Sequence, residues 1–211
     1  MAITKAVVPV AGLGTRLLPA TKSQPKEMLP VGRKPVVQYV IEELERAGIQ
    51  SILFITGRSK TAIENHFDRD QELRDSLKAA GKEDLLDELE YEDKKVEFFY
   101  TRQSEQKGLG HAISLAEGYT HDEPFVIALG DSIIESDGDE PAVQRLIAAF
   151  EKTKAAAAIA FEEVPREEVF RYGIAKPLAE DAEKEIFRVE DLVEKPSIAL
   201  ATGMRLSADV R

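Results

Sequence analysis

The chain has 211 residues, of which 43% are hydrophobic and 32% charged, a composition typical of a globular domain with a sizeable core. No apolar run approaches the roughly 18 residues that span a bilayer, and the first residues lack the long apolar region of a signal peptide, so we expect a cytoplasmic protein without a membrane partner. The absence of cysteine excludes disulfides, thiolate catalysis and thiolate zinc sites, and the formal net charge of −11 argues against a nucleic-acid partner.

Strand patterns alternate with amphipathic helical patterns along the sequence. The expected strands are 5–12, 51–56, 95–103, 124–131 and 155–164, and the expected helices are 35–48, 60–67, 110–119 and 140–152. Shorter strand-like segments follow at 172–178 and 185–196. This alternation predicts an α/β fold with a mostly parallel sheet covered on both faces. Because no repeat or long linker divides the sequence, we expect a single domain over residues 1–211.

Residues 69–91 interrupt the alternation with a charged helical excursion. Residues 82–97 hold eight acids against three lysines, which we interpret as a solvated face. The leucines of the segment are its expected inward side, namely Leu73, Leu77, Leu85, Leu86 and Leu89.

The loop after the first strand is basic although the whole chain is acidic. Residues 1–35 carry six cations and one acid, for a local charge of +5. Gly12 and Gly14 follow the strand, but the later positions fit neither the dinucleotide fingerprint nor the P-loop. The Arg16 guanidinium can grip a phosphate through two hydrogen bonds, and the Lys26 ammonium can neutralise phosphate oxygens. The loop therefore predicts a site for a small anionic ligand.

The segment after the third strand has features suited to a nucleobase. Ligands of parallel sheets bind at the carboxyl ends of the strands. Gln103 carries an amide that can pair with a base edge, and Gly108 and Gly110 allow a ligand to approach the backbone closely. His111 begins the next helix, and we interpret it as a helix-end histidine without a catalytic role.

Two further strand ends carry charged residues. Asp131 ends an apolar run, where it either caps a turn or binds a hard cation such as Mg²⁺ together with substrate phosphates, and we favour the metal. Glu194 and Lys195, taken alone, form a surface ion pair.

These motifs occur in the order found in bacterial UDP-glucose pyrophosphorylases (UTP–glucose-1-phosphate uridylyltransferases), and the chain resembles that family from Ala6 to about Val210. The segments that carry the resemblance are "VPVAGLGTRLLPATKSQPKEMLP", "KPVVQYVIEE", "ENHFD", "RQSEQKGLGHA", "YGI" and "VEKP". It implies a Rossmann-like, three-layer αβα nucleotidyltransferase fold with a mixed, mostly parallel sheet. It also implies that UTP and glucose 1-phosphate are converted into UDP-glucose and pyrophosphate with Mg²⁺ as cofactor.

The resemblance implies roles for individual residues. Nucleotide binding falls to Ala11, Gly12, Gly14, Gln103 and Gly108. The catalytic contacts with the UTP phosphates fall to Arg16 and Lys26, with Lys26 near the attacked α-phosphorus. Glucose 1-phosphate would be held by Gly173, Glu194 and Lys195, and Mg²⁺ by Asp131.

The family continues beyond the length of this chain, with a segment that completes the metal site and contacts other subunits. We therefore expect a C-terminally shortened member, and a dimer or tetramer where that segment is present. Two alternatives stay open: an inactive relative that binds a nucleotide or sugar nucleotide and acts through a partner, and a transferase for another nucleotide and sugar.

Overall fold

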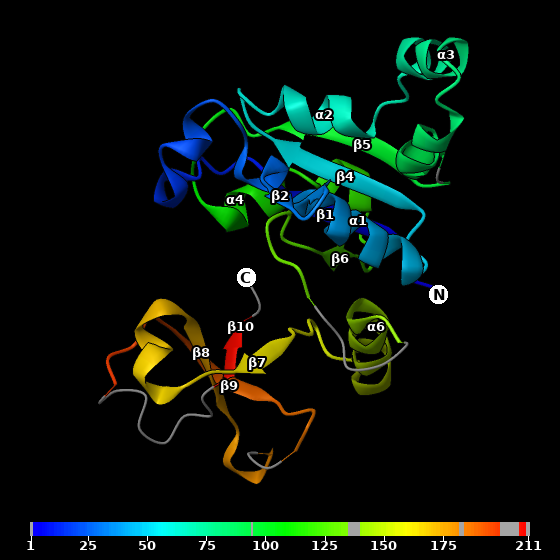
Figure 1. Cartoon of the computed structure of the whole chain (residues 1–211). Helices are drawn as coiled ribbons and strands as arrows, with labels where there is room; N and C mark the ends of the chain where they lie inside the picture. Colours follow the sequence, from blue (N-terminus) through cyan, green and yellow to red (C-terminus); the bar gives the residue numbers. More distant parts are fainter. Residues whose placement is uncertain (1, 94, 135–139, 182–183, 199–206, 210–211) are drawn as a thin grey trace. The chain divides into compact units, whose positions relative to one another are not determined.

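The computed structural model describes residues 2–93, 95–134, 140–181, 184–198 and 207–209 (Figure 1). The chain divides into two compact units, Met1–Val143 and Gln144–Arg211. No helix among the described residues is long and apolar enough to cross a membrane. The single domain expected over residues 1–211 stays a prediction.

The first unit is built on a four-stranded parallel sheet in the order β5-β4-β1-β6. Its strands are β1 (Lys5–Pro9), β4 (Ser51–Thr56), β5 (Glu97–Arg102) and β6 (Val126–Ile127). The register runs from Lys5↔Ser51 between β1 and β4 and reaches Thr56↔Arg102 between β4 and β5. Because all four strands point the same way, the loops that follow them begin along one edge of the sheet.

Helices cover both faces of this sheet. On one face, Val7 and Leu53 pack in a buried cluster with Ala112, which belongs to α4 (Leu109–Ser114). Side chains alternate along a strand, so Phe54 points to the other face, where it stacks on Phe67 of α2 (Thr61–Phe67) with ring centroids 5.4 Å apart. The remaining helices of the unit are α1 (Val36–Arg46), α3 (Gln71–Ala79) and α5 (Glu117–Thr120). This three-layer αβα arrangement confirms the predicted fold class.

The loop after β1 is compact. It contains three 3₁₀ turns, η1 (Thr15–Leu17), η2 (Ala20–Lys22) and η3 (Lys26–Met28). A small antiparallel pair, β2 (Pro30–Val31) and β3 (Lys34–Pro35), then leads into α1. The basic residues of the sequence therefore lie on a folded loop.

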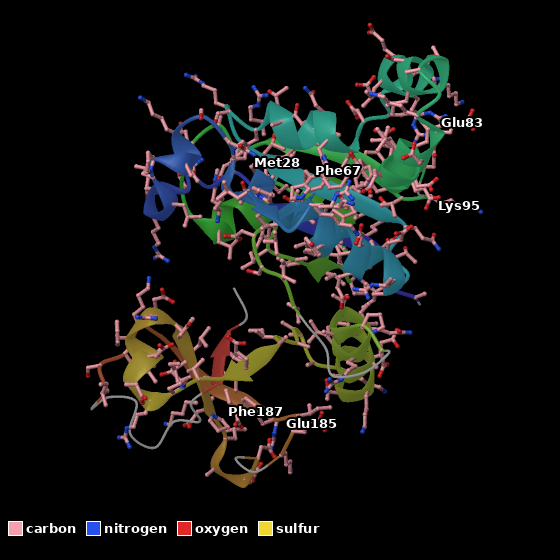
Figure 2. All side chains as sticks on the ribbon, in the orientation of Figure 1. Met28, Phe67, Glu83, Lys95, Glu185 and Phe187 are labelled. Carbon is pink, nitrogen blue, oxygen red and sulfur yellow. The ribbon has the colours of Figure 1, made fainter. Side chains whose placement is uncertain are left out.

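The helical excursion is held together differently from the expectation. It consists of α3, η4 (Glu83–Leu85) and η5 (Asp87–Asp93); Figure 2 labels Glu83 of η4, and Lys95 in the segment that leads from the excursion into β5. Leu73 and Leu85 are 43% and 40% exposed, so the prediction that they face inward is wrong.

Arg74 and its partner Glu92 have buried side chains in the excursion. The Arg74 guanidinium lies 2.8 Å from Glu92 and 2.9 Å from Asp93, and it donates to the carbonyl oxygen of Leu89 over 2.6 Å. A paired guanidinium thus lies inside the excursion beside the half-buried Leu77, Leu86 and Leu89, and its five donors can satisfy several acceptors at once.

The second unit contains an antiparallel sheet in the order β7-β10-β8-β9. Its strands are β7 (Phe161–Glu163), β8 (Gly173–Pro177), β9 (Val189–Glu194) and β10 (Ser207–Asp209), and its helical segments are α6 (Ala142–Thr153), which begins at the unit boundary, η6 (Arg166–Arg171) and η7 (Ala179–Asp181). Val169 and Ile174 form its buried cluster. The strand expected over 155–164 is shortened to β7. It belongs to this antiparallel sheet, which is separate from the parallel sheet of the first unit.

Candidate functional site

The loop after β1 folds back on itself at Gly14. Gly14 adopts a φ of +67°, a conformation that favours glycine, and its carbonyl oxygen accepts a 2.7 Å hydrogen bond from Thr21 Oγ1. A methyl group on Gly14 would lie 3.1 Å from Thr21 Cγ2. The fold of the loop therefore requires glycine at position 14 for structural reasons. The predicted part of Gly14 in nucleotide binding stays a prediction.

Lys26 and Asp131 form an ion pair at the carboxyl edge of the parallel sheet. Lys26 begins η3 and Asp131 follows β6, and their side chains are 24% and 36% exposed, so solutes can reach both. A methyl group on Gly12 would lie 3.7 Å from Lys26 Cε, which places the lysine beside the first glycine of the loop. The fold thus brings together residues predicted to contact phosphate, metal and nucleotide.

Arg16 lies on the same folded loop and is exposed. Within the described part of the chain its guanidinium has no ion pair or hydrogen bond, so its charge is not neutralised by a described neighbour. A guanidinium in this state can grip an anion without first breaking an internal pair. Its contact with phosphate stays a prediction.

Gln103 is buried with a fixed amide orientation. Its side-chain Nε2 donates to the Gly108 carbonyl oxygen over 3.1 Å and lies 3.0 Å from His111 Nδ1. Since a carbonyl oxygen only accepts hydrogen bonds, the nitrogen must face Gly108. Among the described residues Oε1 then has no donor, and it can accept a hydrogen bond from the edge of a base.

The backbone is open at Gly108 and closely packed at Ala11. Gly108 has a φ of +87°, and nothing lies within 4 Å of a methyl group placed on it, so the requirement for glycine comes from the backbone. The Ala11 carbonyl oxygen accepts a 2.8 Å hydrogen bond from Gln106 Nε2. A methyl group on Gly57 would lie 3.1 Å from the same oxygen. The loops after β1, β4 and β5 therefore meet at Ala11.

A buried ion pair lies directly beside Lys26, and sequence reasoning missed it. Glu27 and Lys60 are 1% and 4% exposed, with Glu27 Oε2 2.7 Å from Lys60 Nζ. Burial raises the pKa of Glu27 above its usual value, and the ion pair with Lys60 opposes that rise. Among the described residues Glu27 Oε1 has no hydrogen-bond partner. The sequence gives no signal for this burial, because Glu27 stands in a polar, proline-flanked loop.

The residues predicted for the sugar phosphate lie together in the second unit. Gly173 is paired with Glu194 across β8 and β9. The backbone nitrogen of Lys195 donates to the Tyr172 carbonyl oxygen over 2.8 Å, and its ammonium lies 2.9 Å from the Glu194 carboxylate. The three predicted residues are thus neighbours, while the predicted nucleotide residues lie in the first unit.

The donor set at Asp131 suits a cation that takes most of its ligands from elsewhere. Among the described residues, no group of three or more histidines or acids could hold a metal ion. Asp131 offers carboxylate oxygens, which Mg²⁺ prefers, and the neighbouring Ser132 Oγ is buried without a described partner. The arrangement fits a magnesium ion held by one carboxylate and bound phosphates.

Comparison with known proteins gives one consistent result. The family model "Nucleotidyl transferase" matches residues 5–207. The chain is 50% identical over 194 residues to UTP–glucose-1-phosphate uridylyltransferase 2 of Staphylococcus saprophyticus, and 48% identical over 194 residues to UTP–glucose-1-phosphate uridylyltransferase of Staphylococcus haemolyticus. These matches cover 92% of this chain but 65% and 66% of the relatives, so the chain spans just under two thirds of their length.

Two solved structures agree with the sequence relatives. The UTP-bound UGPase from Acinetobacter baumannii has a TM-score of 0.91 and 38% identity, covering 99% of this chain and 73% of that one. A UDP-glucose pyrophosphorylase complexed with UDP-glucose has a TM-score of 0.83 and 34% identity, covering 99% and 74%.

Proposed function

Because the chain belongs to the nucleotidyl transferase family, where its relatives are UTP–glucose-1-phosphate uridylyltransferases, we propose that it forms UDP-glucose and pyrophosphate from UTP and glucose 1-phosphate. The predicted resemblance to the bacterial UDP-glucose pyrophosphorylase family is confirmed by the same findings. The activity is a proposal because the chain spans 65% of the length of the Staphylococcus saprophyticus relative.

The reaction requires that the two substrates are positioned in line and that their negative charges are neutralised. A phosphate oxygen of glucose 1-phosphate bonds to the α-phosphorus of UTP, the bond from that phosphorus to the bridging oxygen breaks, and pyrophosphate leaves with the electron pair. The attacking oxygen is already anionic, so no general base is needed. Two polyanions must be held in line, which makes preorganised cations the main contribution of the protein.

The juxtaposition of Lys26 and Asp131 at the carboxyl edge of the sheet is the observation that carries this proposal. When UTP binds, the Lys26 ammonium would exchange Asp131 for the α-phosphate. Arg16 would hold the outer phosphates through its guanidinium. Gln103 Oε1 would accept a hydrogen bond from the N3–H of uracil, beside the backbone of Gly108.

Asp131 would hold Mg²⁺ together with phosphate oxygens. The bound cation would neutralise part of the charge of the triphosphate. In the second unit, the Glu194 carboxylate would accept hydrogen bonds from sugar hydroxyls and the Lys195 ammonium would contact the sugar phosphate. A cytoplasmic location, a homo-oligomeric state and the absence of a nucleic-acid partner remain predictions.

Pyrophosphate release by the purified chain tests the proposal. We expect release that depends on UTP, glucose 1-phosphate and Mg²⁺ together. Binding of UTP in calorimetry without any release would favour the inactive relative that acts through a partner. Faster release with another nucleotide or sugar phosphate would favour the transferase for a different substrate pair.

A further inference from the structure

Burying the charges of Glu27 and Lys60 costs more free energy than a purely stabilising role would justify. Removing two charges from water carries a desolvation penalty that their attraction often fails to repay, so a buried ion pair is weak evidence for stability. Here both side chains are almost completely buried, and one carboxylate oxygen of Glu27 has no described partner. An apolar pair of similar size would fill the same space, which points to a role that needs these two groups.

The pair joins the loops that follow two neighbouring strands. Glu27 lies in η3, in the loop after β1, and Lys60 lies just before α2, in the loop after β4. The backbone of Lys60 is itself fixed, because its nitrogen donates to the Gly57 carbonyl oxygen over 3.3 Å and its carbonyl oxygen accepts from Ile63 over 2.9 Å. The loop after β4 therefore anchors η3 through Lys60.

The loop after β6 passes beside Glu27, one member of this pair. A methyl group on Gly130 would lie 3.5 Å from Glu27 Cγ and 2.5 Å from Val10 Cγ1. Gly130 thus lets the aliphatic part of Glu27 pass beside the backbone that leads to Asp131. Three strand-end loops therefore meet at the Glu27 side chain.

The two exposed members of the site are direct neighbours of this buried cluster. Lys26 precedes Glu27, and Asp131 follows Gly130. Within η3, Glu27 is turned inward while Lys26 is turned outward to Asp131. Glu27 therefore lies next to Lys26 in the chain and beside the backbone of Gly130, which precedes Asp131.

We propose that Glu27 and Lys60 are positioning residues for the transfer reaction, and that their buried ion pair holds Lys26 and Asp131 in the geometry that the reaction needs. The proposal rests on the proposed function. Neither residue touches substrate, and both act through Lys26 and Asp131.

The test separates positioning from stability by replacing the charges in stages. Glu27→Gln and Lys60→Met each leave one buried group without its counter-charge, and we expect both to lower the melting temperature. The double variant Glu27→Leu/Lys60→Met puts two apolar side chains in the same space, and such replacements are often neutral or stabilising. We expect its melting temperature to return to that of the parent chain.

Activity should not return with stability. In the double variant we expect kcat for pyrophosphate release to stay about 10- to 100-fold below the parent, with the KM for UTP changed by less than about threefold, because misplacement of about 1 Å costs rate more than binding. The control is Lys176→Met/Glu190→Gln, which removes an exposed 2.9 Å ion pair and should keep parental kcat and stability.

Each outcome decides the question. Parental kcat in a double variant of parental stability overturns the positioning role. If the double variant does not fold, Glu27→Gln assayed below its melting temperature takes its place, and parental kcat there overturns the role as well. Absence of pyrophosphate release from the parent and the control overturns the proposed function itself, and this inference with it.

Discussion

Lys26 is the residue on which the proposed chemistry depends most directly. Its ammonium lies at the edge of the sheet where the nucleotide is expected, and charge accumulates on the α-phosphate as pyrophosphate leaves. We predict that Lys26→Met lowers kcat by about 10²-fold or more, the usual cost of losing one preorganised charge donor, with a smaller change in KM. Steady-state assays of pyrophosphate release measure both constants.

The matched control for this variant is Lys176→Met. Lys176 is also a partly exposed lysine that is paired with a carboxylate, since it lies 2.9 Å from Glu190. It should keep parental kcat. An effect of Lys26→Met on KM alone would mean that this lysine binds the ground state and contributes nothing specific to the transition state.

Replacing Asp131 should change the affinity for UTP in opposite directions without and with Mg²⁺. Without divalent cations its carboxylate neutralises Lys26 and repels a triphosphate. Asp131→Asn should therefore bind UTP more tightly than the parent in EDTA, by about three- to tenfold, in line with the modest energy of a partly exposed ion pair. With Mg²⁺ the parent should gain affinity and the variant should gain less. Calorimetry with and without Mg²⁺ measures both, and equal metal dependence in the two proteins would refute the assignment.

Among the elements, those with a strong local signal were predictable from the sequence. β1 and β4 are largely apolar segments, and the amphipathic pattern of α1 stops just before Gly48. In these elements the local sequence preferences agree with the tertiary structure. The ion pair of Glu27 and Lys60 was not predictable, because its members are 33 residues apart and no periodicity links them. The burial of Arg74 was not predictable for the same reason, since it pairs with acids 18 and 19 residues later.

The excursion is joined to α2 by an aromatic contact that includes a titratable histidine. His66 of α2 stacks on Tyr91 of η5 with ring centroids 4.7 Å apart, and its Nε2 lies 3.1 Å from Gln38 Oε1 of α1. Burial lowers the pKa of His66 below its usual value, and the charge of Glu92 opposes this change. The folded protein therefore favours the neutral imidazole.

Stability should consequently fall on mild acidification. Above the unfolded pKa of about 6.5 the histidine is neutral in both states and adds no pH dependence. As the pH falls below that value, the unfolded chain binds a proton that the folded chain resists, and the free energy of unfolding decreases. Urea denaturation at pH 7.5, 6.5 and 5.5 measures this. The variant His66→Gln, which keeps a hydrogen-bonding group, should show a smaller decrease, and an identical decrease would exclude His66 as the cause.

At the scale of the whole molecule, charge is distributed unevenly. The chain carries a net charge of −11, while residues 1–35 carry +5. A local basic loop attracts a small polyanion within the Debye length of about 8 Å at physiological ionic strength, whereas the acidic remainder disfavours long polyanions such as nucleic acid. This distribution is compatible with the proposed binding of a triphosphate by a loop of an acidic protein.

The division into two units predicts which substrate each half of the molecule controls. Arg16 belongs to the first unit and Lys195 to the second. If each cation contacts the phosphate that the family resemblance assigns to it, Arg16→Ala should weaken UTP binding by about tenfold and leave glucose 1-phosphate affected by less than about twofold. Lys195→Ala should do the reverse. One charge-assisted hydrogen bond lost accounts for an effect of this size.

The double variant completes this argument, because changes at independent sites add in free energy. Isothermal titration of Arg16→Ala/Lys195→Ala with each substrate alone should reproduce each single variant's loss for its own substrate. A loss of UTP affinity in Lys195→Ala as large as that in Arg16→Ala would show that the second unit also binds the nucleotide, and the assignment of Lys195 to the sugar phosphate would have to be abandoned.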